Sequence, residues 1–201
     1  MWDDIVRLTL EHLVIVAVSV LASVAIALPA GILVTRRPKS RTAALGFASV
    51  MQTIPSLALL GFLLPLPLIG GIGTHTAIIA LVLYALLPIL RNTITGILGV
   101  DPAVRESALA MGLTGAQMLW MVELPLAART IVGGIRIATV TTVGTATIAA
   151  AIGAGGLGVL VFRGIAMVDA QEILSGAIPA AALALAADGG LAWIERRLSP
   201  V

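Results

Sequence analysis

Five apolar runs, each long enough to cross a lipid bilayer as a helix, occupy most of the chain. They extend over residues 11–34, 42–66, 74–98, 130–152 and 173–194. At about 1.5 Å per residue, each run covers a hydrocarbon core about 30 Å thick. Apolar and polar residues do not alternate within these runs, as they would in the strands of a membrane barrel. We therefore expect an all-α integral membrane protein with about five transmembrane helices.

Charged residues are too scarce for a water-soluble protein. They make up 11% of the chain, and hydrophobic residues make up 59%, whereas a soluble domain carries about 25% charged residues. The chain has no cysteine and only two histidines, which lie far apart in the sequence. We therefore expect neither a disulfide nor a metal site. The basic residues lie in the gaps between the apolar runs, which favours membrane topology over nucleic-acid binding.

The basic residues also predict the orientation of the chain, because lysine and arginine accumulate in cytoplasmic loops of membrane proteins. With the N-terminus outside, all of the 12 basic residues except Arg7 and Arg163 lie on the cytoplasmic side. The opposite orientation would place only those two inside. We therefore expect the N-terminus outside and the C-terminus in the cytoplasm, which an odd number of spans allows.

The longest cytoplasmic segment, residues 92–129, carries signals for two short helices. Asp101-Pro102 has the pattern of a helix N-cap followed by proline in the first turn. Residues 112–115 would break this helix, and Thr114 and Gln117 have the spacing of a capping box that starts a second one. We expect two short helices at an angle, outside the bilayer.

The second helix of this segment is expected to end at Leu124-Pro125, where the chain returns to the membrane. Apolar residues at the bend between the helices would then be exposed, which favours a docking site for another protein. These residues are Met111, Leu113, Met118, Leu119, Trp120 and Met121.

A spaced motif occupies the same segment. Glu106-Ser107-Ala108 is followed after three residues by Gly112, and after nine more by Val122-Glu123-Leu124-Pro125. This spacing resembles the EAA loop of bacterial ABC importer permeases, in which the pattern is Glu-Ala-Ala, three residues, Gly, nine residues, Ile, one residue and Leu-Pro. Ser107 in place of Ala and Val122 in place of Ile are the departures from it.

The resemblance implies a single transmembrane permease domain over residues 1–201, of the ABC type I importer fold, with a cytoplasmic coupling loop at about 101–125. In that family the loop docks on a separate ATP-hydrolysing subunit, so this chain is not expected to be an enzyme or to hold a cofactor. ATP and Mg would be bound by the partner subunit. The docking residues carried over from the motif are Glu106, Ser107, Ala108, Gly112, Leu124 and Pro125.

Three further runs, residues 54–62, 83–93 and 148–158, look like those of permeases for glycine betaine, choline and carnitine. This resemblance implies a multi-pass protein of the bacterial inner membrane. Its partners would be an ATPase subunit, an extracytoplasmic substrate-binding protein and a second permease, identical or similar. No nucleic acid is expected. A permease for methionine or another amino acid is the alternative, and a channel or secondary transporter fits the motif less well.

The fourth apolar run has small residues at four-residue intervals, which either allow close helix packing or line a path for the solute. They are Gly134, Ala138, Thr142, Ala146 and Ala150. As a hypothesis, Thr142 and Thr145 line the translocation path, together with Gln52 and Pro55 from the second run. The glycines at the outer end of the run, Gly153, Gly155, Gly156 and Gly158, form either a flexible turn or a periplasmic gate.

Two charged residues fall within the apolar runs, where a charge is energetically costly unless it has a partner or reaches water. Arg136 lies close enough to the inner surface for its side chain to reach the headgroups, and the pattern leaves open whether Asp188 belongs to an ion pair. The chain has few aromatic residues, so a cage of rings around a quaternary ammonium group is not expected within it. Solute selectivity should therefore reside in the separate binding protein.

Overall fold

The computed structural model describes residues 2–67 and 69–198, and these residues form helices and connecting turns without a β-strand. The long helices are α1 (Trp2–Thr35), α4 (Thr74–Leu98), α7 (Leu124–Ala149) and α9 (Ala170–Arg197). Shorter helices are α2 (Pro38–Thr53), α3 (Ser56–Leu63), α5 (Pro102–Ala110), α6 (Gly115–Gln117) and α8 (Gly158–Met167). The π-helix η1 (Met118–Glu123) leads into α7, and the 3₁₀ turn η2 (Ala150–Ile152) ends it.

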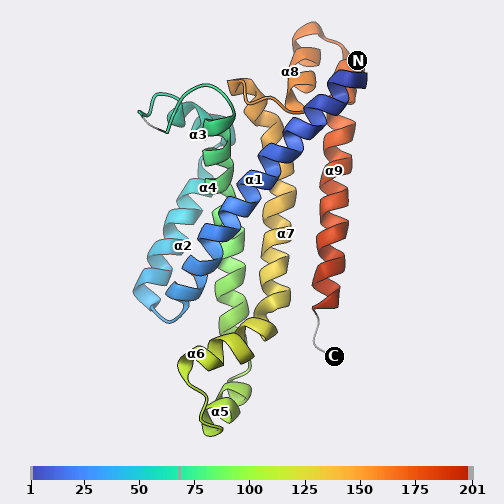
Figure 1. Ribbon diagram of the computed structural model, residues 1–201. Coiled ribbons are helices and arrows are strands. Elements are labelled where there is room, and N and C mark those ends of the chain that lie inside the picture. Colours follow the sequence, from blue (N-terminus) through green and yellow to red (C-terminus); the bar gives the residue numbers. More distant parts are fainter. Residues whose placement is uncertain (1, 68, 199–201) are drawn as a thin grey trace.

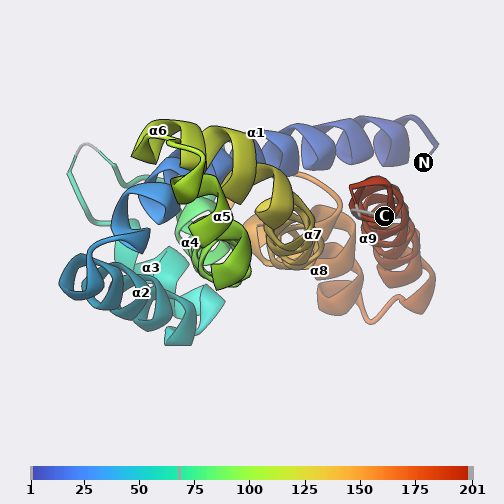
Figure 2. The same cartoon turned by 90° about the horizontal axis from the view of Figure 1, so that it is seen from below.

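The helix α4 lies at the centre of the bundle (Figure 1). It packs against α7 along its length, α1 crosses both of them at an angle, and α2 and α9 lie on opposite edges (Figures 1 and 2). More than half of the residues of α4 are buried, whereas α9 buries only Gly176 and Ala180. Most of the α9 surface is therefore available to lipid or to another protein chain.

Small residues allow α4 and α7 to approach closely. A Cβ atom added at Gly134 of α7 would lie 2.5 Å from Asn92 Cβ and 2.8 Å from the carbonyl oxygen of Pro88, both on α4. Gly134, Ala138, Thr142 and Ala146 are all buried along one face of α7. The stripe of small residues read from the sequence is therefore a packing surface within the bundle.

The second apolar run is bent at Pro55, as a proline within a helix predicts, and the bend is sharp enough to interrupt the span. It is divided into α2 and α3, whose axes differ by 100° across a break at Ile54-Pro55. Proline lacks an N–H group and disfavours helical conformation in the residue before it, so the helix ends at this point. The freed carbonyl oxygen of Ile54 accepts a hydrogen bond from the hydroxyl of Tyr84 in α4.

Among the described residues, four helical stretches are long and apolar enough to span a bilayer, and the bent pair of α2 and α3 makes a fifth if it is counted as one span. The run over residues 74–98 coincides with α4, whereas α1 begins well before residue 11. The N-terminal end of α1 and helix α8 lie at one end of the bundle, and α5, α6 and the end of α9 lie at the other (Figure 1). The two ends of the chain therefore lie at opposite ends of the bundle, as an odd number of spans requires, and the side of the membrane on which each lies stays a prediction.

Candidate functional site

The loop between α4 and α7 forms from the local signals that the sequence carries. Asp101 caps α5, its Oδ1 accepting a hydrogen bond of 2.8 Å from the backbone N–H of Ala103. Thr114 and Gln117 form the expected capping box, in which Gln117 Oε1 accepts from the Thr114 N–H at 2.9 Å and Thr114 Oγ1 from the Gln117 N–H at 3.4 Å. Both sequence predictions are confirmed.

The turn between α5 and α6 depends on the backbone of Gly112. Its φ angle is +84°, a left-handed conformation that residues with a Cβ atom adopt only with strain. No atom lies within 4 Å of a Cβ built at this position, so the requirement for glycine comes from the backbone and not from crowding.

The expected helix end at Leu124-Pro125 is wrong. The chain stays helical from Gly115 to Ile152, and Pro125 lies in the first turn of α7. The wider turn of η1 precedes it, with the N–H of Leu124 bonded to the carbonyl of Leu119 five residues earlier. Proline has no N–H to donate, and its ring is tolerated where the helix has already widened and restarted.

The loop presents a mixed surface to the cytoplasmic end of the molecule. Among the motif residues, Glu106 and Ser107 are exposed, and Ala108 is buried against the rest of the loop. Of the apolar residues expected at the bend, Met111, Trp120 and Met121 are exposed, Leu113 and Leu119 are half-buried, and Met118 is buried. The loop therefore exposes both an acidic side chain and methionine and tryptophan side chains, which suits docking to another protein.

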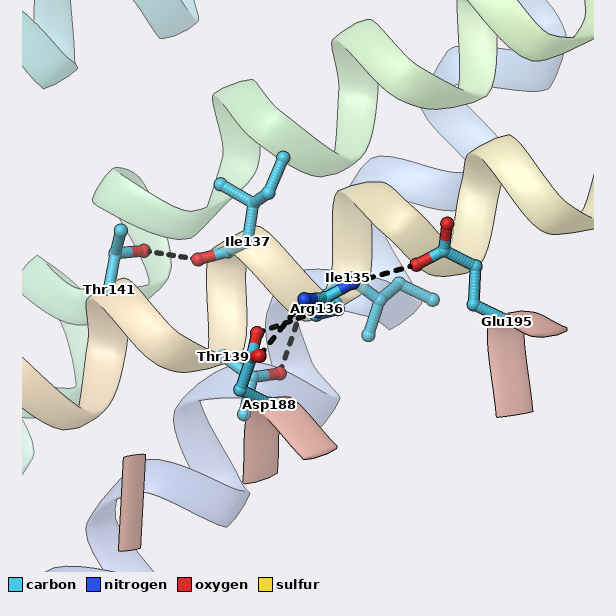
Figure 3. Close-up of polar contacts among 7 residues, drawn as sticks. All are labelled: Ile135, Arg136, Ile137, Thr139, Thr141, Asp188 and Glu195. Carbon is cyan, nitrogen blue, oxygen red and sulfur yellow. Dashed lines mark hydrogen bonds and ion pairs between the residues drawn. The ribbon is translucent and has the colours of Figure 1, made fainter. Parts of the chain in front are cut away.

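A cluster of charges connects α7 to α9 near the cytoplasmic end (Figure 3). Arg136 donates two hydrogen bonds to Asp188, from Nε to Oδ1 at 2.6 Å and from Nη2 to Oδ2 at 2.9 Å. Its Nη1 donates to Glu195 Oε2 at 3.1 Å. The guanidinium is therefore held by two acids of α9, and it does not reach toward the headgroups unpaired as the sequence suggested. The cluster borders an open cavity of about 600 Å³.

The proposed path residues of α7 face in different directions. Thr142 is buried, and its hydroxyl donates to the Ala138 carbonyl at 2.7 Å. Thr145 is half-buried, and the neighbouring Thr141 and Gly144 form the exposed face of the helix. The small residues at four-residue intervals in the sequence identified the packing face of α7. The open face of α7 contains Ile137, Thr141 and Gly144.

The other two proposed path residues lie apart from this face. Gln52 is exposed near the end of α2, and Pro55 is exposed at the break before α3. The helix α2, which carries Gln52, and α7 lie on opposite sides of α4 (Figure 2), whereas α3, which begins after Pro55, contacts α7. Within one chain, the structure therefore does not bring Gln52 to the predicted path residues of α7.

The glycine-rich segment after α7 is an ordered turn. Gly153, Gly155 and Gly156 have positive φ angles of 76°, 83° and 73°. Glu11 of α1 accepts a hydrogen bond of 3.3 Å from the Gly156 N–H, and the Thr74 hydroxyl of α4 donates to the Ala154 carbonyl at 3.2 Å. The turn thus joins the outer ends of α1, α4 and α7.

The fourth glycine of this segment has a packing role. A Cβ atom at Gly158 would collide with the backbone carbonyl of Thr147 in α7. Next to the turn lies a cavity of about 850 Å³, whose lining includes Asp3, Arg7, Glu11 and Gly155. Among these four residues, only the glycine was predicted as a site residue from the sequence.

Comparison with known proteins gives a consistent result. Residues 13–200 match the family described as "Binding-protein-dependent transport system inner membrane component". The carnitine transport permease protein OpuCB of Listeria monocytogenes is 46% identical over 192 residues, covering 96% of this chain and 87% of the relative. The choline transport system permease protein OpuBB of Bacillus subtilis is 44% identical, with the same coverage of 96% and 87%. The osmoprotectant import permease protein OsmW of Salmonella typhimurium is 43% identical, covering 96% of this chain and 89% of the relative.

Solved structures agree with this assignment. A subunit in an inward-facing structure of the MetNI methionine ABC transporter superposes with a TM-score of 0.88 at 28% identity, covering 100% of this chain and 98% of that one. A chain of an amino acid ABC transporter shares the fold, with a TM-score of 0.79 at 18% identity, covering 97% of this chain and 94% of that one. The chain therefore belongs to the family of inner-membrane components of binding-protein-dependent transport systems.

Proposed function

We propose that this chain is the membrane-spanning permease subunit of an ATP-driven importer of quaternary ammonium osmoprotectants such as carnitine, choline and glycine betaine. The observation that carries this proposal is its identity of 43–46%, over nearly its whole length, to permeases named for those solutes. The similarity to the methionine transporter is lower in sequence, at 28%. A permease for methionine or another amino acid is therefore the second candidate.

The coupling loop would dock on a separate ATPase subunit, which binds ATP and Mg and carries out hydrolysis. The docking residues are those of the spaced motif, Glu106, Ser107, Ala108, Gly112, Leu124 and Pro125. The exposure of Glu106, Met111 and Trp120 supports this proposal, because a short loop that exposes apolar side chains is otherwise unfavourable. In this proposal the chain has no enzymatic activity of its own.

The remaining partners would be an extracytoplasmic binding protein and a second permease subunit, in a bacterial cytoplasmic membrane. The family description supports the binding protein and the inner membrane. The second permease would cover the open faces of α7 and α9, which stay exposed among the described residues. Purification of the complex would show whether this second subunit is identical to this chain or only similar to it.

The solute path would run along the open face of α7. Thr145 belongs to the proposed path together with Thr141 and Gly144, and Thr142 would support it from the packing side. Gln52 would reach the path only through rearrangement or from the second subunit, whereas Pro55 precedes α3, which contacts α7. At the outer end of α7, the turn with Gly153, Gly155, Gly156 and Gly158 would act as a gate, supported by its attachment to α1 and α4.

Reconstitution in proteoliposomes tests the function. The permease, the ATPase subunit and the binding protein of the same system are combined with labelled carnitine, choline, glycine betaine and methionine. We expect uptake of the quaternary ammonium solutes that requires ATP and the binding protein. Uptake of methionine alone would show that the chain is a permease for an amino acid instead. Uptake without the ATPase subunit would indicate a channel or secondary transporter.

A further inference from the structure

One acidic side chain is almost fully buried where the coupling loop joins the membrane helices. Glu123, the last residue of η1, is 2% exposed. A buried carboxylate is unfavourable unless cationic partners compensate for its lost hydration. The partners of Glu123 therefore determine what this position does.

Two arginines from distant parts of the chain supply that compensation. Arg36, in the connection between α1 and α2, donates from Nη2 to Glu123 Oε2 at 2.7 Å. Arg105, in α5, places its Nε 3.2 Å from Glu123 Oε1. We call these three residues, Arg36, Arg105 and Glu123, the Glu123 bridge.

Arg105 extends the bridge to a fourth element. Its Nη2 donates a hydrogen bond to the backbone carbonyl of Ile97, in the last turn of α4. The bridge thus joins α5 to the cytoplasmic ends of α1, α4 and α7, four segments that are separated in the sequence. Contacts of this kind fix the position of α5 as well as its conformation.

The Glu123 bridge contacts one face of α5, and the opposite face is exposed to solvent. Arg105 and Ala108, three residues apart, lie on the same side of the helix, and Ala108 is buried. Glu106 and Ser107 are exposed on the opposite side. A partner can therefore contact α5 through its outer face while the inner face stays attached to the bundle.

A short helix needs such an attachment. With nine residues, α5 is shorter than the length at which an isolated helix is stable in water. It is connected to α4 through Gly99–Asp101 and to α6 through Gly112–Thr114, and glycine gives both connections backbone freedom. Without the Glu123 bridge, α5 could tilt on these connections without moving the spans.

We infer that Glu123 is a positioning residue, which transmits movement of α5 to the membrane helices through Arg105 and Arg36. This inference rests on the proposed docking of the coupling loop on an ATPase. The side chain of Arg105 is 27% exposed and that of Arg36 is 60% exposed, so water screens the ion pair of Arg105 less, whereas Arg36 makes the shorter contact, a hydrogen bond of 2.7 Å.

The test uses the complete complex of permease, ATPase subunit and binding protein in proteoliposomes. The variants are Glu123→Gln, Arg105→Gln, Arg36→Gln, the double variant Glu123→Gln/Arg105→Gln, and Glu123→Asp. Arg37→Gln is the matched control, because Arg37 is an exposed neighbour of Arg36 outside the bridge. Three quantities are measured: ATPase subunit retained on purification, ATP hydrolysed, and solute taken up per ATP.

We expect Glu123→Gln to lower solute uptake per ATP about tenfold, a typical strength of coupling between sites. Arg105→Gln should have a similar effect, Arg36→Gln a smaller one, and Arg37→Gln none. Glu123→Asp, which keeps the charge, should recover part of the coupling. The double variant is decisive, because it leaves Glu123 and Arg105 both neutral and so removes the penalty of an unpaired buried charge between them.

The double variant should therefore retain the ATPase subunit and hydrolyse ATP, yet remain as uncoupled as Glu123→Gln. Wild-type uptake per ATP in the double variant would overturn the inference. Failure of the double variant to retain the ATPase would overturn it as well, because the bridge would then serve assembly alone. Failure of the proposed function is recognised separately, as absence of ATP-dependent uptake by the unaltered complex.

Discussion

At the scale of single residues, the backbone of Gly112 sets the angle between the two loop helices. Replacing Gly112 with alanine forces a side chain into a left-handed conformation, at about 1–2 kcal/mol. We expect weaker retention of the ATPase subunit on purification, and ATP-dependent uptake that falls in parallel, while membrane insertion persists.

Gly115 provides the control for this prediction. A Cβ atom there also meets nothing within 4 Å, but Gly115 lies in α6 and has no positive φ angle. Gly115→Ala should therefore behave as the unaltered protein, and Gly112→Asn should lose less than Gly112→Ala, because asparagine tolerates this conformation. Equal effects of the two alanine variants would show that backbone geometry is not the cause.

At the scale of elements, α7 has a packing face and an open face, and glycine occurs on both. Gly134→Ala places a methyl group 2.5 Å from Asn92 Cβ, so the α4–α7 contact must separate, at about 1–3 kcal/mol. We expect a lower midpoint of thermal unfolding for the purified protein, measured by tryptophan fluorescence. Gly144→Ala, with nothing within 4 Å of its added carbon, should unfold as the unaltered protein does. A lower midpoint in Gly144→Ala but not in Gly134→Ala would show that the packing face and the open face of α7 had been assigned the wrong way round.

Comparison of the helices with the sequence shows which features residues close in the chain can predict. The helical run of α4 and both helix caps in the loop depend on residues close in sequence, and all were predicted. The proline in the second apolar run indicated a bend at Pro55, but the residues remain apolar on both sides of it and gave no sign that the helix is interrupted there. The pairing of Arg136 with Asp188, 52 residues apart, and of Glu123 with Arg36, 87 residues apart, depends on how helices pack, and no local spacing predicts that.

At the scale of the whole molecule, the orientation in the membrane can be tested directly, because the chain has no native cysteine. Single cysteines are introduced at Ser40 and Ala116, at the cytoplasmic end, and at Ile72, in the outer connection before α4. All three positions are exposed. In intact cells, a membrane-impermeant thiol reagent should label only the cysteine at Ile72, and permeabilised cells should show all three. Labelling of Ser40 with protection of Ile72 would invert the orientation.

The aromatic side chains of the molecule are dispersed, which bears on where solute is recognised. The hydroxyl of Tyr84 is bonded to the Ile54 carbonyl, and the ring of Trp193 lies under Arg197, 5.0 Å from its guanidinium carbon. Trp120 is exposed on the coupling loop, at the opposite end from the outer turn. Because a quaternary ammonium group is held by several rings at once, these positions do not form a tight site within the chain.

We therefore expect the permease–ATPase complex alone to show no saturable binding of glycine betaine or choline at micromolar concentration, as measured by calorimetry. Addition of the binding protein should supply both the affinity and solute-stimulated ATP hydrolysis. Thr145→Leu, which narrows the open face of α7, should then lower the uptake rate severalfold and leave the affinity of the binding protein unchanged, since that site lies on another molecule. Saturable binding to the complex without the binding protein would instead locate a recognition site among the helices, and the threonine variant would show whether α7 contributes to it.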